Sequence, residues 1–305
     1  MQREDEKFNS KYEFIDNKKD CSKLLYVLAG YKPLLWENVF GRIKRFCPKD
    51  VDVCIISSGI FSEKLKDFCI EYDWSYLSTE INKLTIAQNI TISLFPKAEL
   101  IFKMDEDVFL TEHFWEYLEE TFGHYDKMYR IGFVGPLMPL HNYGFYQYLE
   151  LKGYEKEWKQ YAPQFSKLKI GGHSKDDNAA LYSDEIADFV WDKCEQIDKE
   201  ALEFRNMNLE PKFVNMRFPI CAIMFRRKFW EKMGGFEVGV GNGGGSDEEQ
   251  MVKFCAVNSY FVLCDIRMIC YHFGFYYQEH ILYRKYRVFK EKFELNIGEE
   301  KTIGL

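Results

Sequence analysis

The sequence predicts an α/β fold in which a parallel, doubly wound sheet is flanked by helices. Over the first 140 residues, short apolar runs alternate with segments in which apolar residues recur at helical spacing. Hydrophobic residues make up 47% of the chain and aromatic residues 17%, which is enough to build a substantial core. A length of 305 residues suits one large domain or two small ones.

The first half of the chain supplies most of the expected sheet. Buried strands are predicted at 23–28, 51–58, 73–77 and 99–104. Helices are predicted between them, at 32–46 with Pro33 in the first turn, at 62–72, and at 84–95. Strands that alternate with helices in this way form parallel, doubly wound sheets, which bind ligands at the carboxyl ends of their strands.

The alternation stops after residue 140. Residues 141–215 are polar and aromatic, with one clear helix at 184–197, and are expected to form an insertion or lid. A strand, a short helix and a pair of glycines follow within 218–236. A glycine-rich loop then leads to a helix at 247–256, two strands at 260–265 and 267–273, and a basic, aromatic helix at 276–293.

Composition excludes several classes of protein. The net charge of −7 argues against a dedicated nucleic-acid-binding protein. No apolar run approaches the roughly 18 residues that a transmembrane helix needs, and the charged N-terminus lacks a signal core. The nine cysteines are scattered and form no Cys-x-x-Cys pair, which favours buried, reduced thiols over disulfides or a zinc site.

An acidic triplet, Asp105, Glu106 and Asp107, closes the fourth predicted strand. In extended backbone, residues two apart point to the same side, so Asp105 and Asp107 could together hold a hard divalent cation such as Mg²⁺ or Mn²⁺. The alternative is an acidic surface turn in front of the helix expected near Thr111.

A second acidic group, Asp247 and Glu248, opens the helix after the glycine-rich loop. Ser246 and Glu249 match a capping box, which places Asp247 and Glu248 in the first helical turn. There they either compensate the helix dipole or provide a general base. His272 follows a late apolar run, where it is either a structural histidine or a functional one.

The order of these features resembles the GT-A nucleotide-sugar glycosyltransferases, in particular the large inverting family of bacterial polysaccharide-type transferases. The features are "KMDEDVF", "RRKFWEKMGGFE", "SDEEQM" and the late "CYHFG", and the resemblance covers 23–140 and 218–274. It implies a GT-A fold, which is a Rossmann-like mixed sheet flanked by helices, with a helical, aromatic insertion and a C-terminal helix. The implied organisation is a flexible lead-in (1–22), a catalytic domain (23–274) and a helical tail (275–305). The domain would comprise a nucleotide-sugar-binding half (23–140), the insertion (141–215) and an acceptor half (216–274).

The resemblance also implies roles for individual residues. Asp105 would contact the donor's ribose or the metal, Asp107 would bind the metal, and His272 would complete the metal site. The catalytic base would be Asp247 or Glu248, because the alignment is ambiguous by one residue. The remaining donor contacts would come from strand ends and the third helix, through Ala29, Gly30, Ser57, Ser58, Lys83 and Asn89.

The function implied by the resemblance is metal-dependent, inverting sugar transfer from a nucleotide sugar, with a UDP-sugar favoured. The metal would be Mn²⁺ or Mg²⁺, and the acceptor a glycan or a lipid-linked saccharide. The protein would be cytoplasmic, and its basic C-terminal helix would either pack on the sheet or touch the inner face of a membrane. Two alternatives remain open: a sugar nucleotidyltransferase, and a non-catalytic carbohydrate-binding protein.

Overall fold

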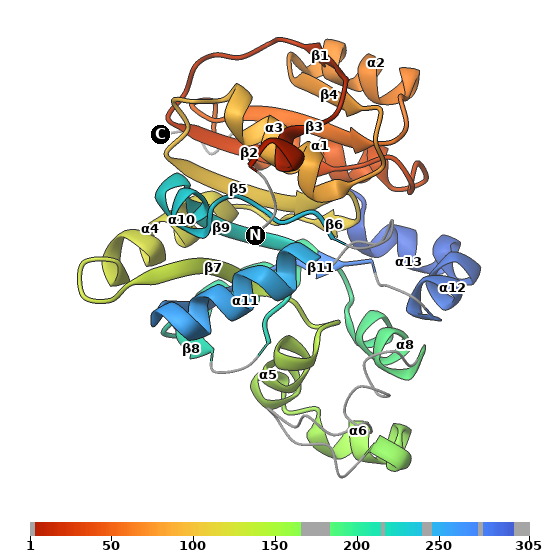
Figure 1. Cartoon of the computed structure of the whole chain (residues 1–305). Helices are drawn as coiled ribbons and strands as arrows, with labels where there is room; N and C mark the ends of the chain where they lie inside the picture. The colour runs from red at the N-terminus through yellow and green to blue at the C-terminus, as the bar shows by residue number, and fades with distance from the viewer. Residues whose placement is uncertain (1–3, 166–183, 215–216, 240–245, 274–276, 296–305) are drawn as a thin grey trace, which may run out of the picture.

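The structure is a computed structural model that describes residues 4–165, 184–214, 217–239, 246–273 and 277–295. Nine of the described strands form one sheet in the order β1-β4-β3-β2-β5-β9-β7-β10-β8 (Figure 1). A small second sheet pairs β11 with β6. The strands are β1 (Tyr12–Ile15), β2 (Lys23–Leu28), β3 (Asp52–Ser58), β4 (Ser75–Thr79), β5 (Leu100–Asp105), β6 (Val108–Phe109), β7 (Ile131–Leu137), β8 (Lys212–Val214), β9 (Ala222–Arg226), β10 (Phe261–Ile269) and β11 (Tyr271–His272).

The predicted mixed α/β architecture is confirmed. Strands β4, β3, β2 and β5 pair in parallel, as the alternating pattern predicts. Strand β9 then runs antiparallel between β5 and β7, and β7 pairs in parallel with β10. The long excursion between β7 and β9 returns to the edge of the sheet at which β5 and β7 end, since Cys221, just before β9, accepts a hydrogen bond from the N–H of Asp105. Local sequence patterns do not predict this reversal.

Helices pack around the sheet and fill most of the connections (Figure 1). Helix α2 begins at a typical N-cap, in which the Ser62 hydroxyl accepts a hydrogen bond from the backbone N–H of Leu65 (3.3 Å). The described α-helices are α1 (Trp36–Phe46), α2 (Glu63–Tyr72), α3 (Leu84–Leu94), α4 (Phe114–Tyr125), α5 (Asn142–Lys152), α6 (Glu155–Tyr161), α8 (Asp184–Lys193), α9 (Ile197–Asn206), α10 (Arg227–Met233), α11 (Ser246–Asn258), α12 (Tyr277–Arg284) and α13 (Tyr286–Phe293).

The N-terminal segment differs from the expected flexible lead-in. A short 3-10 helix, η1 (Glu4–Phe8), comes first, and β1 then pairs antiparallel with β4 at the sheet edge. The ammonium of Lys7 also donates to the carbonyl of Gly234 at 2.7 Å. The segment is too short and too polar to show a strand periodicity in the sequence. It is stabilised by pairing with β4, which is distant along the chain.

Several boundaries also differ from the prediction. Helix α1 begins at Trp36, so Pro33 lies in the turn before it rather than in its first turn. The two strands expected at 260–265 and 267–273 are mainly one long strand, β10, followed by the short β11. The expected 276–293 helix is divided into α12 and α13.

The segment 141–215 is more regular than its composition suggests. The predicted helix corresponds to α8, but α5, α6 and α9 are additional described helices, and β8 joins the main sheet beside β10. Figure 1 shows α5, α6 and α8 grouped at one end of the molecule. The predicted insertion is therefore partly integrated into the core sheet.

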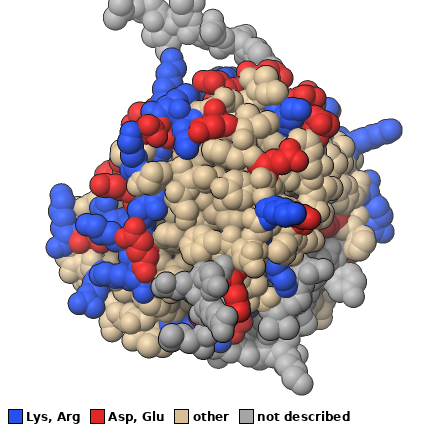
Figure 2. All heavy atoms as spheres, turned by 45° about the horizontal axis from the view of Figure 1, so that its top comes forward, with Lys and Arg blue, Asp and Glu red and all other residues tan. Residues whose placement is uncertain are grey.

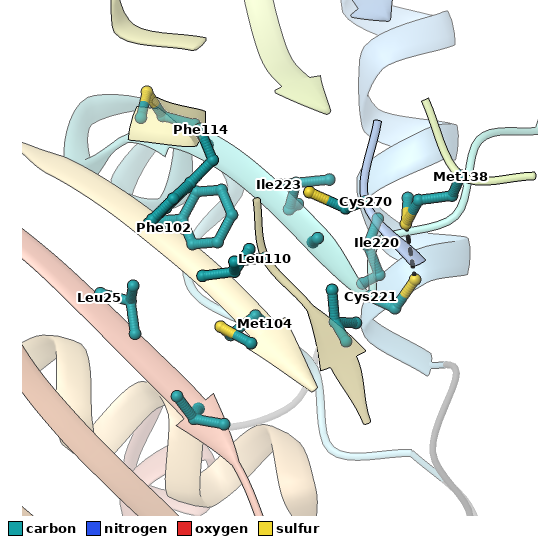
Figure 3. Close-up of a cluster of buried hydrophobic side chains, with 14 of the residues drawn as sticks. Leu25, Phe102, Met104, Leu110, Phe114, Met138, Ile220, Cys221, Ile223 and Cys270 are labelled. Atoms are coloured by element: carbon teal, nitrogen blue, oxygen red, sulfur yellow. Dashed lines mark hydrogen bonds between the residues drawn. The ribbon is translucent and has the colours of Figure 1, made fainter. Parts of the chain in front are cut away.

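The core is one continuous apolar cluster on the sheet. Figure 3 shows part of it, with Leu25, Phe102, Met104 and Ile223 from neighbouring strands packed beside Leu110 and Phe114. The tail contributes as well, because Phe293 of α13 stacks on Phe109 with ring centroids 4.4 Å apart. The aromatic residues Phe289 and Phe293 are thus buried against the protein's own core, which leaves the expected membrane contact of this helix without support.

On the face drawn in Figure 2, lysine and arginine side chains are interspersed with aspartate and glutamate, and uncharged residues fill much of the middle. No described helix combines the length and the apolar character that crossing a bilayer requires.

Candidate functional site

The predicted metal ligands converge although they are far apart in sequence. Asp105 ends β5, Asp107 lies in the turn before β6, and His272 belongs to β11. Strand β11 pairs antiparallel with β6, with His272 opposite Val108, which sets the imidazole beside Asp107. His272 Nε2 lies 3.1 Å from Asp107 Oδ2, and one candidate ligand atom from each of the three residues lies within 4.8 Å of the others.

The middle residue of the acidic triplet has a structural role. Buried Glu106 accepts hydrogen bonds from the backbone N–H groups of Gly30 (2.9 Å) and Tyr31 (3.0 Å), and from the indole N–H of Trp36. Its carboxylate thereby ties the β5–β6 turn to the end of β2. The three adjacent carboxylates therefore divide into one anchor, Glu106, and two candidate ligands.

Two lysines compensate the charge of the candidate ligands. Lys32 pairs with Asp107 and also with Glu279 of α12. Lys103, itself buried, pairs with Asp105 at 3.0 Å. Burial alone would raise the pKa of Asp107, but His272 and Lys32 hold it well below its ordinary value. Burial raises the pKa of Asp105 despite Lys103, and the charge of Asp107 adds to that rise.

The first turn of α11 faces the same region. Asp247 is buried, and its Oδ2 accepts a hydrogen bond from Gln88 Nε2 at 3.0 Å. The Lys103 ammonium lies 4.0 Å from that same oxygen, so one lysine bridges the end of β5 and the start of α11. The carboxylates that close β5 and those that open α11 therefore border one site, as the predicted chemistry requires.

Glu248 differs from its neighbour in accessibility. Its side chain is 18% exposed, against 4% for Asp247, and it pairs with the exposed Arg217. Burial raises the pKa of Glu248 above its ordinary value, although Arg217 and Lys103 oppose the rise. Of the two carboxylates that the sequence left as alternatives, Glu248 is the more accessible to solvent.

The predicted nucleotide contacts at the strand ends have mixed outcomes. Gly30 has a φ of +148°, and its N–H is directed at Glu106, so it shapes the turn after β2. Buried Ala29 continues the β2–β3 pairing by donating to the Ile56 carbonyl at 2.8 Å. The exposed Tyr31 follows them and donates through its hydroxyl to the Ser58 carbonyl (3.2 Å).

Three of the side chains predicted to contact the donor are buried in the structure. The Ser57 hydroxyl is fully buried against the Tyr76 hydroxyl at 2.8 Å, and the Ser58 hydroxyl donates to the Ile81 carbonyl at 3.2 Å. Asn89 is fully buried too. Its amide N–H groups donate to the carbonyls of Lys7 and Phe236, and its oxygen accepts from Trp230 and from the Phe236 N–H. The amide of Asn89 is therefore fully partnered inside the core and has no group left for a phosphate, whereas the contacts expected of Ser57 and Ser58 remain predictions.

Lys83 immediately precedes α3, and its ammonium donates to the Gly239 carbonyl at 3.1 Å. That contact places Lys83 beside the start of the glycine-rich segment, of which 240–245 lie outside the described residues. The phosphate contact expected of Lys83 remains a prediction.

The sequence analysis did not identify Lys32, Lys103 or Arg217 as residues of the site. Lys103 could have been found, because it lies two residues before Asp105 on the same strand and so points to the same side. Lys32 and Arg217 carry no such signal, since their partners are 75 and 31 residues away along the chain.

The residues present fit a divalent cation. Two carboxylates and an imidazole offer the oxygen and nitrogen atoms that Mn²⁺ binds, and their candidate ligand atoms are close enough to share one ion. A bound ion would share Asp107 with Lys32 and Asp105 with Lys103. The predicted ligand set is thus assembled in one place, while its metal remains a prediction.

Comparisons with known proteins give structural matches alone. Neither a protein-family model nor a curated protein matches the sequence. One similar solved structure is "Mannosyltransferase PcManGT from Pyrobaculum calidifontis in complex with GDP-Man and Mn2+", at 12% identity and a TM-score of 0.48, with 88% of this chain and 62% of that chain covered. Another is "Crystal structure of GalNAc-T7 with UDP, GalNAc and Mn2+", at 12% identity and a TM-score of 0.49, with 84% and 44% covered. The chain spans less than two thirds of either protein, and a likeness at this level does not identify a function.

Proposed function

We propose that this protein is a metal-dependent glycosyltransferase that transfers a sugar, with inversion, from a nucleotide sugar to a hydroxyl group of an acceptor. One observation carries the proposal: Asp105, Asp107 and His272 converge at the strand ends, directly across Lys103 from the carboxylates that open α11. Departure of a diphosphate requires positive charge, and attack by a weakly nucleophilic hydroxyl requires a base. In this proposal, Asp105, Asp107 and His272 would hold the cation, and a carboxylate of α11 would be the base.

The donor side would be held by the aspartates. Asp105, Asp107 and His272 would bind Mn²⁺ or Mg²⁺, and the bound ion would neutralise the charge that develops on the diphosphate as the glycosidic bond breaks. Lys32 and Lys103 keep additional positive charge beside the two aspartates. The nucleoside would lie over Gly30 and the exposed Tyr31, with a UDP-sugar as the favoured donor.

The acceptor side would depend on Glu248. Its carboxylate takes the proton of the acceptor hydroxyl while the hydroxyl oxygen bonds to the anomeric carbon, and the bond from that carbon to the diphosphate oxygen breaks. The diphosphate leaves with the bonding electron pair. Asp247, held by Gln88 and Lys103, positions the first turn of α11 and does not itself take the proton. The acceptor would be a glycan or a lipid-linked saccharide.

The test is nucleotide binding with and without metal. The full chain should bind UDP about 5–150-fold more tightly with Mn²⁺ than without it, the usual range of coupling between two ligands, and Asp107→Ala should abolish that gain. The matched control is Asp67→Ala, which removes an exposed carboxylate from α2 and should leave the gain intact. Calorimetric titration measures both.

Turnover separates the remaining alternatives. Incubation with a panel of nucleotide sugars should release the nucleoside diphosphate, through transfer or slow hydrolysis. A sugar nucleotidyltransferase would instead form or consume a nucleoside triphosphate, and a binding module would release nothing. Metal-independent UDP binding, or a Mn²⁺ gain preserved in Asp107→Ala, would overturn the proposal.

A further inference from the structure

A second group of potential ligands lies beside the aspartates and is richer in sulfur. Cys221 Sγ lies 3.3 Å from His141 Nε2 and 3.2 Å from Met138 Sδ. The rings of His141 and His272 stack with centroids 5.0 Å apart and an interplanar angle of 21°. One candidate ligand atom from each of His141, Cys221 and His272 lies within 4.8 Å of the others.

These side chains come from three separate parts of the fold, and backbone hydrogen bonds hold two of these parts in place. Met138 follows β7, and the N–H of His141 donates to its carbonyl at 3.1 Å. Gly144 lets the first turn of α5 lie against the backbone of Met138, because a Cβ at this position would lie 1.9 Å from the Met138 carbonyl oxygen. Cys221 immediately precedes β9, and its carbonyl accepts from the Asp105 N–H at 2.9 Å. Figure 3 shows Met138 and Cys221 directed at each other at the edge of the apolar core.

The spacing suits a thiophilic ion. With Zn–S near 2.3 Å and Zn–N near 2.0–2.1 Å, a thiolate and an imidazole on one tetrahedral ion lie about 3.6 Å apart. The observed 3.3 Å between Cys221 Sγ and His141 Nε2 needs little adjustment to reach that value. Two imidazoles, a thiol and a nearby thioether are soft or borderline donors, whereas the aspartate pair is hard. Of the three candidate ligands, His141 is partly exposed, and Cys221 and His272 are buried.

We propose that His141, Cys221 and His272 form a binding site for a thiophilic cation of the Zn²⁺ class, with Met138 as a neighbouring sulfur. The site shares His272 with the aspartate pair, so the two sites compete for one imidazole. When the ion binds, the Cys221 thiol loses its proton to solvent. The consequence for catalysis rests on the proposed function: Zn²⁺ would withdraw His272 from Asp105 and Asp107 and inhibit the Mn²⁺-dependent reaction.

Spectroscopy on the full, reduced, metal-free chain tests the site without any need for activity. Titration with Co²⁺ should produce a thiolate-to-cobalt charge-transfer band, and Zn²⁺ should remove it with one equivalent. Cys221→Ser and His141→Asn should each abolish the band and weaken Zn²⁺ binding by more than about 100-fold, since losing a mere outer-shell partner costs 10–100-fold.

Matched controls separate this site from the other cysteines and histidines. Cys255→Ser removes a different buried thiol and His113→Asn an exposed imidazole, and both should keep the band. Circular dichroism verifies that each variant is folded, and Met138→Leu, which should shift the band without abolishing it, serves if Cys221→Ser is unfolded. A band that persists in His141→Asn and Cys221→Ser, or that is missing from the wild type, overturns the proposal. Failure of Mn²⁺-dependent UDP binding would remove the proposed function but leave this band in place.

Discussion

The two acidic clusters of the site, the turn cluster (Asp105, Glu106, Asp107) and the helix cluster (Asp247, Glu248), solve the same electrostatic problem differently. In the turn cluster, one carboxylate is neutralised by neutral donors, since Glu106 accepts from two backbone N–H groups and an indole. Its neighbours are instead paired with Lys32 and Lys103.

In the helix cluster, the buried member, Asp247, accepts a hydrogen bond from the amide of Gln88 and lies 4.0 Å from the ammonium of Lys103, which also pairs with Asp105. The more exposed member, Glu248, pairs with an exposed arginine. In each cluster, one carboxylate holds the backbone in place and the others remain available for chemistry. Adjacency in sequence therefore gives no information about role; the partner of each carboxylate does.

The largest effect should come from the helix cluster. Glu248→Gln removes the proton acceptor but keeps the shape of the side chain, so turnover should fall by about 10²–10⁴-fold, the range that general-base catalysis supplies. Asp247→Asn keeps a hydrogen-bond acceptor for Gln88 and should reduce turnover much less. Steady-state rates with saturating nucleotide sugar measure both variants.

UDP binding in the presence of Mn²⁺ is the control for that pair, because neither substitution touches the metal ligands. The two assignments would be exchanged if Asp247→Asn proved the more damaging variant while its UDP affinity stayed normal. Unimpaired turnover in both would eliminate the helix cluster as the source of the base.

The next effect concerns stability and comes from the turn cluster. Glu106→Ala leaves the N–H groups of Gly30 and Tyr31 and the indole of Trp36 without their buried acceptor. The buried indole N–H left unsatisfied costs about 1–3 kcal/mol, and the two part-buried backbone donors add less, so the free energy of unfolding should fall by about 2 kcal/mol or more. Denaturant unfolding followed by circular dichroism measures the change.

Glu71→Ala provides the comparison, since Glu71 is exposed on α2 and should change the free energy of unfolding by less than about 0.5 kcal/mol. Glu106→Gln should fall between the two because it retains one acceptor oxygen. If Glu106→Ala unfolded like Glu71→Ala, the anchoring role of Glu106 would be wrong.

The sheet formed by β2 to β5 was predictable because local sequence patterns define its strands. The range of β2 matches its prediction, and β3, β4 and β5 lie within a residue or two of theirs, since short apolar runs bounded by polar residues suffice to define buried strands. The carboxyl-end rule then predicted that Asp105 and Asp107 would lie at the ligand edge.

What could not be predicted depends on contacts between distant segments. The sequence near β9 does not indicate that this strand lies antiparallel between β5 and β7. Asn89 resembled a donor-binding residue in sequence, yet it joins η1 to the segment after α10 inside the core. The sulfur-rich group around Cys221 could not be predicted either. His141 and His272 are 80 and 51 residues from Cys221 along the chain, and no Cys-x-x-Cys spacing marks the group.

The smallest expected effect is a change in the pH dependence of turnover, which reports on the ionisation of Glu248. Burial raises the pKa of Glu248, so its carboxylate should become protonated, and turnover should fall, at a higher pH than for an ordinary glutamate. Arg217 opposes that rise through its ion pair with Glu248. Arg217→Gln should therefore move the acidic limb of the pH profile of kcat to still higher pH, without changing the plateau at neutral pH by much.

The sign follows from the charge form that each partner stabilises. Arg217 favours the ionised carboxylate, so its removal raises the pKa and extends the pH range in which the base is protonated. Arg226→Gln is the matched control, because Arg226 pairs with Asp126 rather than with either acidic cluster. It should leave the acidic limb where it is. A limb that stayed fixed in Arg217→Gln, or moved to lower pH, would show that the titrating group is not Glu248, and the assignment would then pass to the buried Asp247.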